Sequence, residues 1–450
     1  MAPGCGSSTV RKSPRPDPGA VRSVECKPAR RVGLHSRAAR RRVSRHARPV
    51  MNQRQGVSSM ESVDTILKLH ENARLDSLNL IVSENRMSER ARAPLASDIS
   101  QRYAADFYHG TAPARQLTEY VTKLASETFE ARYVNLSPIS GNMSLLAVVF
   151  ALSGTGDHIG RIPPFFPGGG YPLDYAVFDR RPLPLPFSDE NWQVDLDATV
   201  SLLNEVKPPL VVLGSSIVTY PMPVREISEI VHAYGGLVAY DGSHTLGLIA
   251  GGQYQDPLRE GADLLLGSTH KTFPGPQGGL VLTNDKEIHE RVETLSNFRP
   301  LSGPTLICNP HLARVASLGI VLEETSWTDY AKRVVDNARS VAVALLDAGI
   351  PLRGTAARNF AELTYCHQIL VDVPLDEARR LRDHLGCHRI NVDGFLRLGV
   401  SEITRLGFTV EECAELGRLI AALIKNENDV PAEVDRRIGE LVESHREVVL

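Results

Sequence analysis

One stretch decides the fold: Gly267-Ser-Thr-His-Lys-Thr-Phe-Pro-Gly-Pro-Gln-Gly-Gly279. It directly follows the apolar run Ala262-Asp-Leu-Leu-Leu266, which we interpret as a short buried strand. Lys271 therefore stands where a strand leaves a sheet, and α/β folds carry their chemistry at such places. A partly desolvated lysine loses its proton more easily and can form a Schiff base with a carbonyl; pyridoxal phosphate is the usual cofactor for such a lysine. Taken alone, Lys271 is better explained as a solvated surface residue, so the rest of the chain has to decide.

Composition describes an ordinary globular chain of 450 residues, with 42% hydrophobic and 23% charged residues. This length predicts two domains plus terminal extensions. No apolar run is long enough to cross a bilayer, so we expect no membrane partner. Six cysteines lie scattered without CxxC or metal-ligand spacing, which predicts free thiols, no metal site and a reducing, cytoplasmic location; they are Cys5, Cys26, Cys308, Cys366, Cys387 and Cys413.

Residues 1–58 are rich in Arg, Ser, Pro and Gly and lack a sustained apolar period, which predicts a disordered basic extension. Residues 1–50 hold 13 Lys and Arg against Asp17 and Glu25, although the whole chain carries a net charge of −3. The body is therefore acidic, which argues against nucleic acid as its partner. The extension has three explanations: a transit peptide, a basic arm that touches nucleic acid, or sequence upstream of a start at Met51 or Met60. We favour the last, because nothing in the segment connects to the chemistry downstream.

Downstream, apolar runs alternate with amphipathic segments, which predicts an α/β fold with a mainly parallel sheet covered by helices on both faces. We expect an N-terminal arm over 59–95, a large domain over 96–310, and a connecting helix with a smaller α/β domain over 311–450. The predicted strands are 133–136, 210–213, 237–240, 264–266, 280–283 and 368–373. The predicted helices are 115–130, with Leu117, Tyr120, Val121 and Leu124 on one face, then 143–153, 196–205, 225–234, 313–348, 375–385 and two more before Leu450.

Three further features fit a cofactor at Lys271. Ser140-Gly141-Asn142 follows a strand and opens a helix, so backbone N–H groups and a hydroxyl can bind a phosphate there; an ordinary helix cap is the alternative. Asp241 ends a strand, where a carboxylate could hold a pyridine nitrogen protonated; a capping role in a tight turn is the alternative. Arg397 lies between apolar residues and suits bidentate capture of a carboxylate, or else a structural ion pair.

These residues and their surroundings resemble the serine hydroxymethyltransferase family, closest to its archaeal-type branch. The resemblance covers about residues 62–425. It rests on the 267–279 segment and on Tyr240-Asp-Gly-Ser-His-Thr-Leu-Gly-Leu-Ile-Ala-Gly-Gly252, Gln255–Asp263, Leu80-Ile-Val-Ser-Glu-Asn85, Tyr103-Ala104, Ser140-Gly141 and Leu396–Arg405. It implies the fold type I, aspartate aminotransferase-like architecture of pyridoxal 5'-phosphate enzymes. It also implies a homodimer with interface active sites, which can pair into a tetramer.

The resemblance also implies roles by position. Lys271 forms the Schiff base with the cofactor, Asp241 pairs with the pyridine nitrogen, and His244 lies against the cofactor. The cofactor-binding set is completed by Ser140, Gly141, Asn142 and His270, and by Gly278 and Gly279 from the partner subunit. Ser83 and Arg397 take the substrate carboxylate, and Tyr103 and Tyr108 line the site across the interface.

The sequence departs from the family pattern in two places. The family has Tyr-Ala-Glu before a longer loop, but here Ala105 replaces the glutamate used near the pterin, with Asp106 one place away. The histidine that stacks on the cofactor is replaced by Tyr171, whose ring can provide the same contact.

The implied reaction breaks or forms the Cα–Cβ bond of a β-hydroxy-α-amino acid, leaving a glycine-derived carbanion delocalised into the cofactor ring. Because the glutamate is missing, we expect a pterin-independent aldolase or transaldolase that uses a threonine-like donor and passes a glycyl unit to another aldehyde. The alternative is serine hydroxymethyltransferase itself, with a tetrahydrofolate-type pterin and with Asp106 or His109 in the role of the glutamate. An inactive cofactor-binding homologue with an interaction role is a third hypothesis.

Overall fold

The computed structural model describes residues 62–104, 108–164, 179–296, 305–307, 309, 311–355 and 363–449. The described residues belong to one compact unit, Gly56–Leu450. The predicted extension 1–58 lies outside the described residues. Within the described ranges, we find no helix with the length and apolar character needed to cross a membrane.

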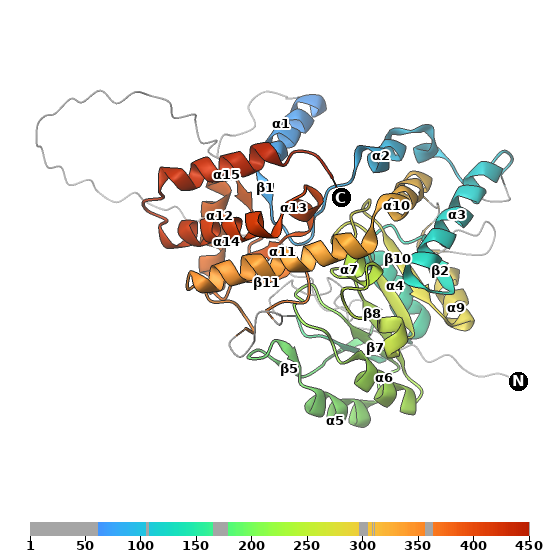
Figure 1. The fold of residues 1–450 in the computed structure, drawn as a ribbon. Helices are drawn as coiled ribbons and strands as arrows, with labels where there is room; N and C mark the ends of the chain where they lie inside the picture. Colours follow the sequence, from blue (N-terminus) through green and yellow to red (C-terminus); the bar gives the residue numbers. More distant parts are fainter. Residues whose placement is uncertain are drawn as a thin grey trace, which may run out of the picture. The chain divides into compact units, whose positions relative to one another are not determined.

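A seven-stranded sheet forms the centre of the fold (Figure 1). Its strand order is β2-β10-β9-β8-β7-β3-β4. Strands β7, β8, β9, β3 and β4 pair in parallel, and β10 runs antiparallel to both of its neighbours. The prediction of a mainly parallel sheet is therefore confirmed. The strands are β2 (Tyr133–Asn135), β3 (His158–Arg161), β4 (Arg181–Pro184), β7 (Leu210–Leu213), β8 (Leu237–Asp241), β9 (Leu264–Ser268) and β10 (Gly279–Thr283).

Helices cover both faces of this sheet, as the continuously apolar central strand β7 requires. Leu210 and Val212 of β7 pack with α4 (Gly141–Leu152) and α9 (Lys286–Ser296) on one face. Val211 and Leu213 face the other side, in the cluster that contains residues of α3 (Ala112–Phe129), α5 (Leu196–Val206), α6 (Val224–Ala233), α7 (Leu246–Ala250) and α10 (Leu312–Glu324). Two buried faces are what the run Leu-Val-Val-Leu requires.

A separate core forms toward the C-terminus around the long helix α11 (Trp327–Asp347), which packs against α14 (Val410–Lys425) (Figure 1). The antiparallel pair β11 (Gln368–Leu370) and β13 (Arg397–Gly399) belongs to this core. We keep the division into arm, large domain and small domain as a proposal, which the separate cores support. The remaining helices here are α12 (Leu375–Cys387), α13 (Ser401–Arg405) and α15 (Ala432–Ser444).

Near its N-terminus the described chain begins with α1 (Val63–Leu75), and the Ser62 side chain caps this helix by accepting from the Thr65 N–H. No residue of α1 is buried. Strand β1 (Leu78–Asn79) then pairs in parallel with β12 (Ile390–Asn391), which joins the arm to the C-terminal core. Further short elements are α2 (Glu89–Arg92), with Ser88 as its N-cap, the 3-10 helices at Ala93–Ala96 and Asp98–Gln101, α8 (Pro257–Glu260), and the hairpin β5 (Phe187–Ser188) with β6 (Gln193–Val194).

Several predictions about individual elements were wrong in detail. Strands β3 and β4 were missed because they are short and polar or proline-rich; a sheet edge tolerates the prolines of β4. The predicted helix over 313–348 is two helices, separated at Thr325 and Ser326. The helix at 115–130 exists, but Tyr120 is exposed instead of lying on its inner face. The strand 368–373 ends at Leu370, and three helices instead of two follow α12.

Candidate active site

The predicted site residues follow strands that end at the same edge of the sheet. Strand β8 ends at Asp241, and β9 ends shortly before Lys271. Since parallel neighbours place their carboxyl ends together, these side chains converge. The start of α4 reaches the same place: a Cβ on Gly141 would lie 2.2 Å from Ser268 Oγ and 3.0 Å from Ser243 Oγ. A residue without a side chain is therefore needed at position 141.

Lys271 is partly buried, and its surroundings lower the pKa of its amine. Burial lowers the pKa of Lys271 to about 8; the positive charge of Arg397 acts in the same direction and the carboxylate of Asp241 acts against it. The backbone around the lysine is held by residues that sequence reasoning missed: Asn85 Nδ2 donates to the Lys271 carbonyl at 2.7 Å, and Tyr330 Oη donates to the Thr272 carbonyl at 2.7 Å. This pKa leaves a much larger fraction of the amine unprotonated near neutral pH than in an ordinary lysine, which favours its use as a nucleophile.

Asp241 is a buried carboxyl group with a defined orientation. Burial raises the pKa of Asp241, while hydrogen bonding with Ser243 and the charge of Lys271 lower it. The Ser243 backbone N–H donates to Asp241 Oδ1 at 2.8 Å. This bond is the local turn that the capping alternative requires. The backbone bond engages Oδ1, and the Ser243 side chain also interacts with the carboxyl group.

His244 is 4% exposed and lies in a cluster of imidazoles. Its ring stacks on His367 with a centroid distance of 5.7 Å and an interplanar angle of 16°. Burial lowers the pKa of His244 well below its usual range, and the positive charge of Lys271 adds to this effect. Burial likewise lowers the pKa of His270 to about 4 and that of His367 to about 3. The imidazoles are therefore neutral at physiological pH.

Arg397 lies at the start of β13 and is oriented by two neighbours. Its Nε donates to Asp393 Oδ2 at 2.5 Å, and its Nη1 donates to the Ser216 carbonyl at 2.6 Å. The structural ion pair suggested as an alternative thus exists, with Asp393. The residue before it, Leu396, has φ of 55°, a left-handed conformation that is uncommon for a branched side chain and typical of functional sites. Arg397 is held in a fixed orientation by a strained turn.

Ser140 is the N-cap of α4, and its Oγ accepts a hydrogen bond from the Met143 N–H at 3.2 Å. The first N–H groups of this helix, at Gly141 and Asn142, have no partner within the helix and can bind an anion. Gly278 and Gly279 are buried in this same chain; a Cβ on Gly279 would lie 2.4 Å from the Ser140 carbonyl oxygen. Both glycines thus pack beneath α4, and their contact with a partner's cofactor stays a prediction.

Two hollows border the site. One of 780 Å³ is lined by Ser83 and His270, with residues of α1 on its other side. The other, of 240 Å³, is lined by Arg397, Phe395, Trp192 and Arg353. Tyr103 and Tyr108 are 40% and 37% exposed, with ring centroids 5.3 Å apart. The predicted roles of Tyr171, Ala105 and Asp106 lie outside the described residues.

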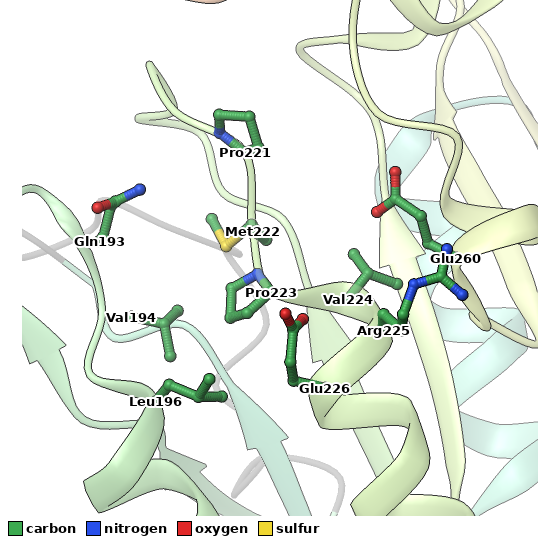
Figure 2. Close-up of a pocket in the computed structure, with 10 residues that line it drawn as sticks. All are labelled: Gln193, Val194, Leu196, Pro221, Met222, Pro223, Val224, Arg225, Glu226 and Glu260. Carbon is green, nitrogen blue, oxygen red and sulfur yellow. The ribbon is translucent and has the colours of Figure 1, made fainter. Parts of the chain in front are cut away.

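A further hollow of 460 Å³ lies elsewhere, between the start of α6 and the residues that follow β5 (Figure 2). Its wall combines apolar side chains, such as Val194, Leu196 and Met222, with charged ones, such as Arg225 and Glu226. None of the predicted site residues lines it. We therefore place the site at the sheet edge.

Comparison with known proteins agrees with this geometry. The family model described as serine hydroxymethyltransferase matches residues 57–375. The chain is 34% identical over 403 residues to a serine hydroxymethyltransferase of Methanothermobacter thermautotrophicus, covering 83% of this chain and 92% of that protein. The chain belongs to the serine hydroxymethyltransferase family. A relative from Methanopyrus kandleri is 35% identical over 428 residues, covering 87% of this chain and 95% of that protein.

The family membership confirms the predicted fold. A crystal structure of L-threonine transaldolase from Pseudomonas fluorescens in the internal aldimine state superposes with a TM-score of 0.75 and 24% identity. The match covers 85% of this chain and 90% of that chain. The chain therefore has the fold type I architecture of pyridoxal 5'-phosphate enzymes, and it is a pyridoxal-phosphate-dependent enzyme of the transferase type.

The residues present fit pyridoxal 5'-phosphate, the cofactor of this family. An amine with a lowered pKa (Lys271), a buried carboxyl group (Asp241) and the N-terminus of α4, which begins at Gly141, correspond to the aldehyde, the ring nitrogen and the phosphate. Sequence reasoning missed His367, Gln368, Asp393, Ser216, Asn85 and Tyr330, which orient these groups. Only Asp393 carried a signal, since an acid four residues before Arg397 is a common local pair.

Proposed function

We propose that this enzyme cleaves and forms the Cα–Cβ bond of a β-hydroxy-α-amino acid and passes the glycyl unit to another aldehyde without a pterin. The observation that carries the proposal is the sequence Tyr103-Ala-Ala-Asp-Phe-Tyr108, in which alanine stands where the family resemblance places its glutamate. Without that carboxylate, transfer of a one-carbon unit to a pterin loses its proton-transfer group. The shared fold of the Pseudomonas fluorescens L-threonine transaldolase supports a reaction of this kind.

The residues at the sheet edge have distinct tasks in such a reaction. When bound, pyridoxal phosphate supplies an electron sink for the pair released as the Cα–Cβ bond breaks. Lys271 offers a readily deprotonated amine to the cofactor aldehyde, and Asp241 holds a proton on the ring nitrogen. Arg397, fixed by Asp393 and the Ser216 carbonyl, keeps its remaining N–H groups for the substrate carboxylate, together with Ser83.

We also propose that the enzyme is a homodimer with shared sites. Tyr103 and Tyr108 are exposed although the resemblance assigns them to a site wall, which a partner's site would explain. On α1, Val63, Ile66 and Leu67 are 72%, 53% and 53% exposed. Apolar side chains on an unburied helix are typical of a surface that another subunit covers.

Serine hydroxymethyltransferase activity is the second candidate, favoured by the relatives at 33–35% identity that bear this name. It would require serine and a tetrahydropterin, with Asp106 or His109 taking the place of the glutamate. Either reaction uses the same Lys271, Asp241 and Arg397. The two candidates differ in donor and acceptor. In the first, an aldehyde receives the glycyl unit of a threonine-like donor; in the second, a tetrahydropterin receives the one-carbon unit of serine.

Incubation of the enzyme with L-threonine and a second aldehyde, with and without tetrahydrofolate, distinguishes the two candidates. We expect acetaldehyde and a new β-hydroxy-α-amino acid to form, each at the same rate with and without tetrahydrofolate. Lys271→Ala serves as the inactive control. Turnover of L-serine that depends strictly on the pterin, with no reaction of L-threonine, would contradict the proposal and establish the second candidate.

A further inference from the structure

Gln368 lies between His244 and Arg397, the two side chains that the proposed site presents to the cofactor and the substrate. It is the first residue of β11 and is 0% exposed. Strand β11 pairs with β13 so that Gln368 is opposite Gly399 and Leu370 is opposite Arg397. Gln368 and Arg397 are thus diagonal neighbours on one face of the pair, within reach of long side chains.

The side-chain amide of Gln368 makes two hydrogen bonds through one nitrogen. Nε2 donates to the Ser216 carbonyl oxygen at 3.2 Å and lies 3.1 Å from His244 Nδ1. The same Ser216 carbonyl accepts from Arg397 Nη1 at 2.6 Å. The Ser216 carbonyl oxygen therefore accepts from both Gln368 and Arg397. Gln368 in turn holds His244, so His244 is connected to the arginine assigned to the substrate carboxylate.

The orientation of this amide follows from the nature of its partners. A carbonyl oxygen can only accept, so the amide group facing Ser216 has to be the nitrogen; the reversed amide would set two acceptors against each other. The two hydrogens of Nε2 then serve the Ser216 oxygen and His244 Nδ1. His244 Nδ1 must be an acceptor, and in the neutral ring the proton must reside on Nε2.

We propose that Gln368 is a positioning residue that holds His244 in the neutral tautomer protonated at Nε2 and couples its orientation to that of Arg397. His244 then presents an N–H donor to the cofactor and substrate and cannot act as the base that takes the β-hydroxyl proton. The surroundings agree: the charged or titratable neighbours are Lys271, Arg397, His367 and His270, and each disfavours an imidazolium. Gln368 Oε1 is buried and makes no hydrogen bond in the described structure. Because an unpaired buried oxygen lowers stability, this arrangement indicates a role for Gln368 other than stabilising the fold.

The proposal predicts a spectroscopic property that does not depend on turnover. In full-length protein labelled with ¹⁵N-histidine, with cofactor bound and without it, the His244 nitrogens should show a proton on Nε2 and none on Nδ1. His244→Gln assigns the signals. In Gln368→Glu, a carboxylate oxygen faces Nδ1 and should draw the proton to that nitrogen. A wild-type protein with its proton on Nδ1 would overturn the proposal even if every variant failed to fold.

A matched control separates positioning from the loss of a buried amide. Asn337 is also buried, and its Nδ2 also donates twice, to Thr404 Oγ1 and the Phe408 carbonyl, away from the site. Both Gln368→Leu and Asn337→Leu should lower the stability. Only Gln368→Leu should alter the His244 signals and lower kcat, by about 10-fold, the effect expected when one hydrogen bond that orients a neutral N–H donor is lost.

The kinetic part of this inference rests on the proposed function, whereas the tautomer measurement does not. An enzyme with no activity toward L-threonine but with His244 protonated at Nε2 refutes the proposed reaction and supports the positioning role. Equal changes in the His244 signals and kcat for Gln368→Leu and Asn337→Leu would refute the positioning role.

Discussion

The site has an inner wall, at the sheet edge, and an outer wall on the side of Tyr103 and Tyr108. The two walls differ in how much of each is built by one chain. The inner wall, at the sheet edge, contains Asp241, His244 and Gln368, which are buried and hydrogen-bonded within the chain. The outer wall that we propose contains Tyr103 and Tyr108, which are exposed. The inner wall carries the chemistry that the family shares. The outer wall, where the sequence departs from the family, is where the choice of acceptor has to be made.

The largest expected effect is on the inner wall. Lys271→Ala removes the amine that binds the cofactor aldehyde, so we expect turnover of L-threonine to fall at least about 1000-fold. Acetaldehyde release measures the effect, and circular dichroism checks the fold. Lys123→Ala, on the exposed face of α3, is the control and should keep full activity. Retained activity in Lys271→Ala would refute the assignment of the site.

The outer wall can be tested by mixing a variant of Tyr108 with a variant of Lys271. Tyr108→Ala alone should lower turnover about 30-fold if the ring contacts a partner's site. If Tyr108 serves the partner's Lys271, re-associating Tyr108→Ala with Lys271→Ala in equal amounts should restore about a quarter of the wild-type activity, because heterodimers contain one intact site. Activity that stays at the mean of the two variants would place Tyr108 in the site of its own chain.

Ser140→Ala distinguishes a phosphate ligand from a simple helix cap. Loss of the cap should cost about 1 kcal/mol of unfolding free energy, measured by urea unfolding of the apoprotein. Loss of a hydroxyl at the phosphate should in addition weaken cofactor binding about 10-fold. Asp195→Ala removes the N-cap of α5 and is the matched control, with a stability loss alone. Equal cofactor affinity in both variants would leave Ser140 as a cap only.

The smallest expected effect is a change in stability with pH. Burial in the folded apoprotein lowers the pKa of Lys271 to about 8, from 10.5 for an ordinary lysine. Between these values the unfolded chain binds the extra proton, so wild-type stability should rise relative to Lys271→Met by about 1 kcal/mol per pH unit above pH 8. Urea unfolding of both apoproteins at pH 7.5 and 9.5 measures this. A constant difference would mean that burial does not perturb the lysine.

Residues of the inner wall also differ in how well the sequence predicts them. Lys271 follows a continuous apolar run and Asp241 ends another, and such runs can be recognised without a structure. Gln368 and Ser216 could not be found in this way, because their roles arise from contacts between residues 152 positions apart. Strands β3 and β4 were missed because their pairing depends on neighbours and not on their own polar sequences.

The antiparallel strand β10 closes the loop that carries Lys271 within a short stretch of chain. Residues 269–278 form the hairpin connection between β9 and β10, closed by hydrogen bonds from the Thr269 N–H to Gly278 and from the Gly275 N–H to Thr269. Arg397, by contrast, depends on a carbonyl 181 positions away. Local contacts form early in folding, and distant ones form late. The loop around Lys271 can therefore close early, whereas its contacts with Asn85 and Tyr330, like the bond between Arg397 and the Ser216 carbonyl, form only when distant segments come together.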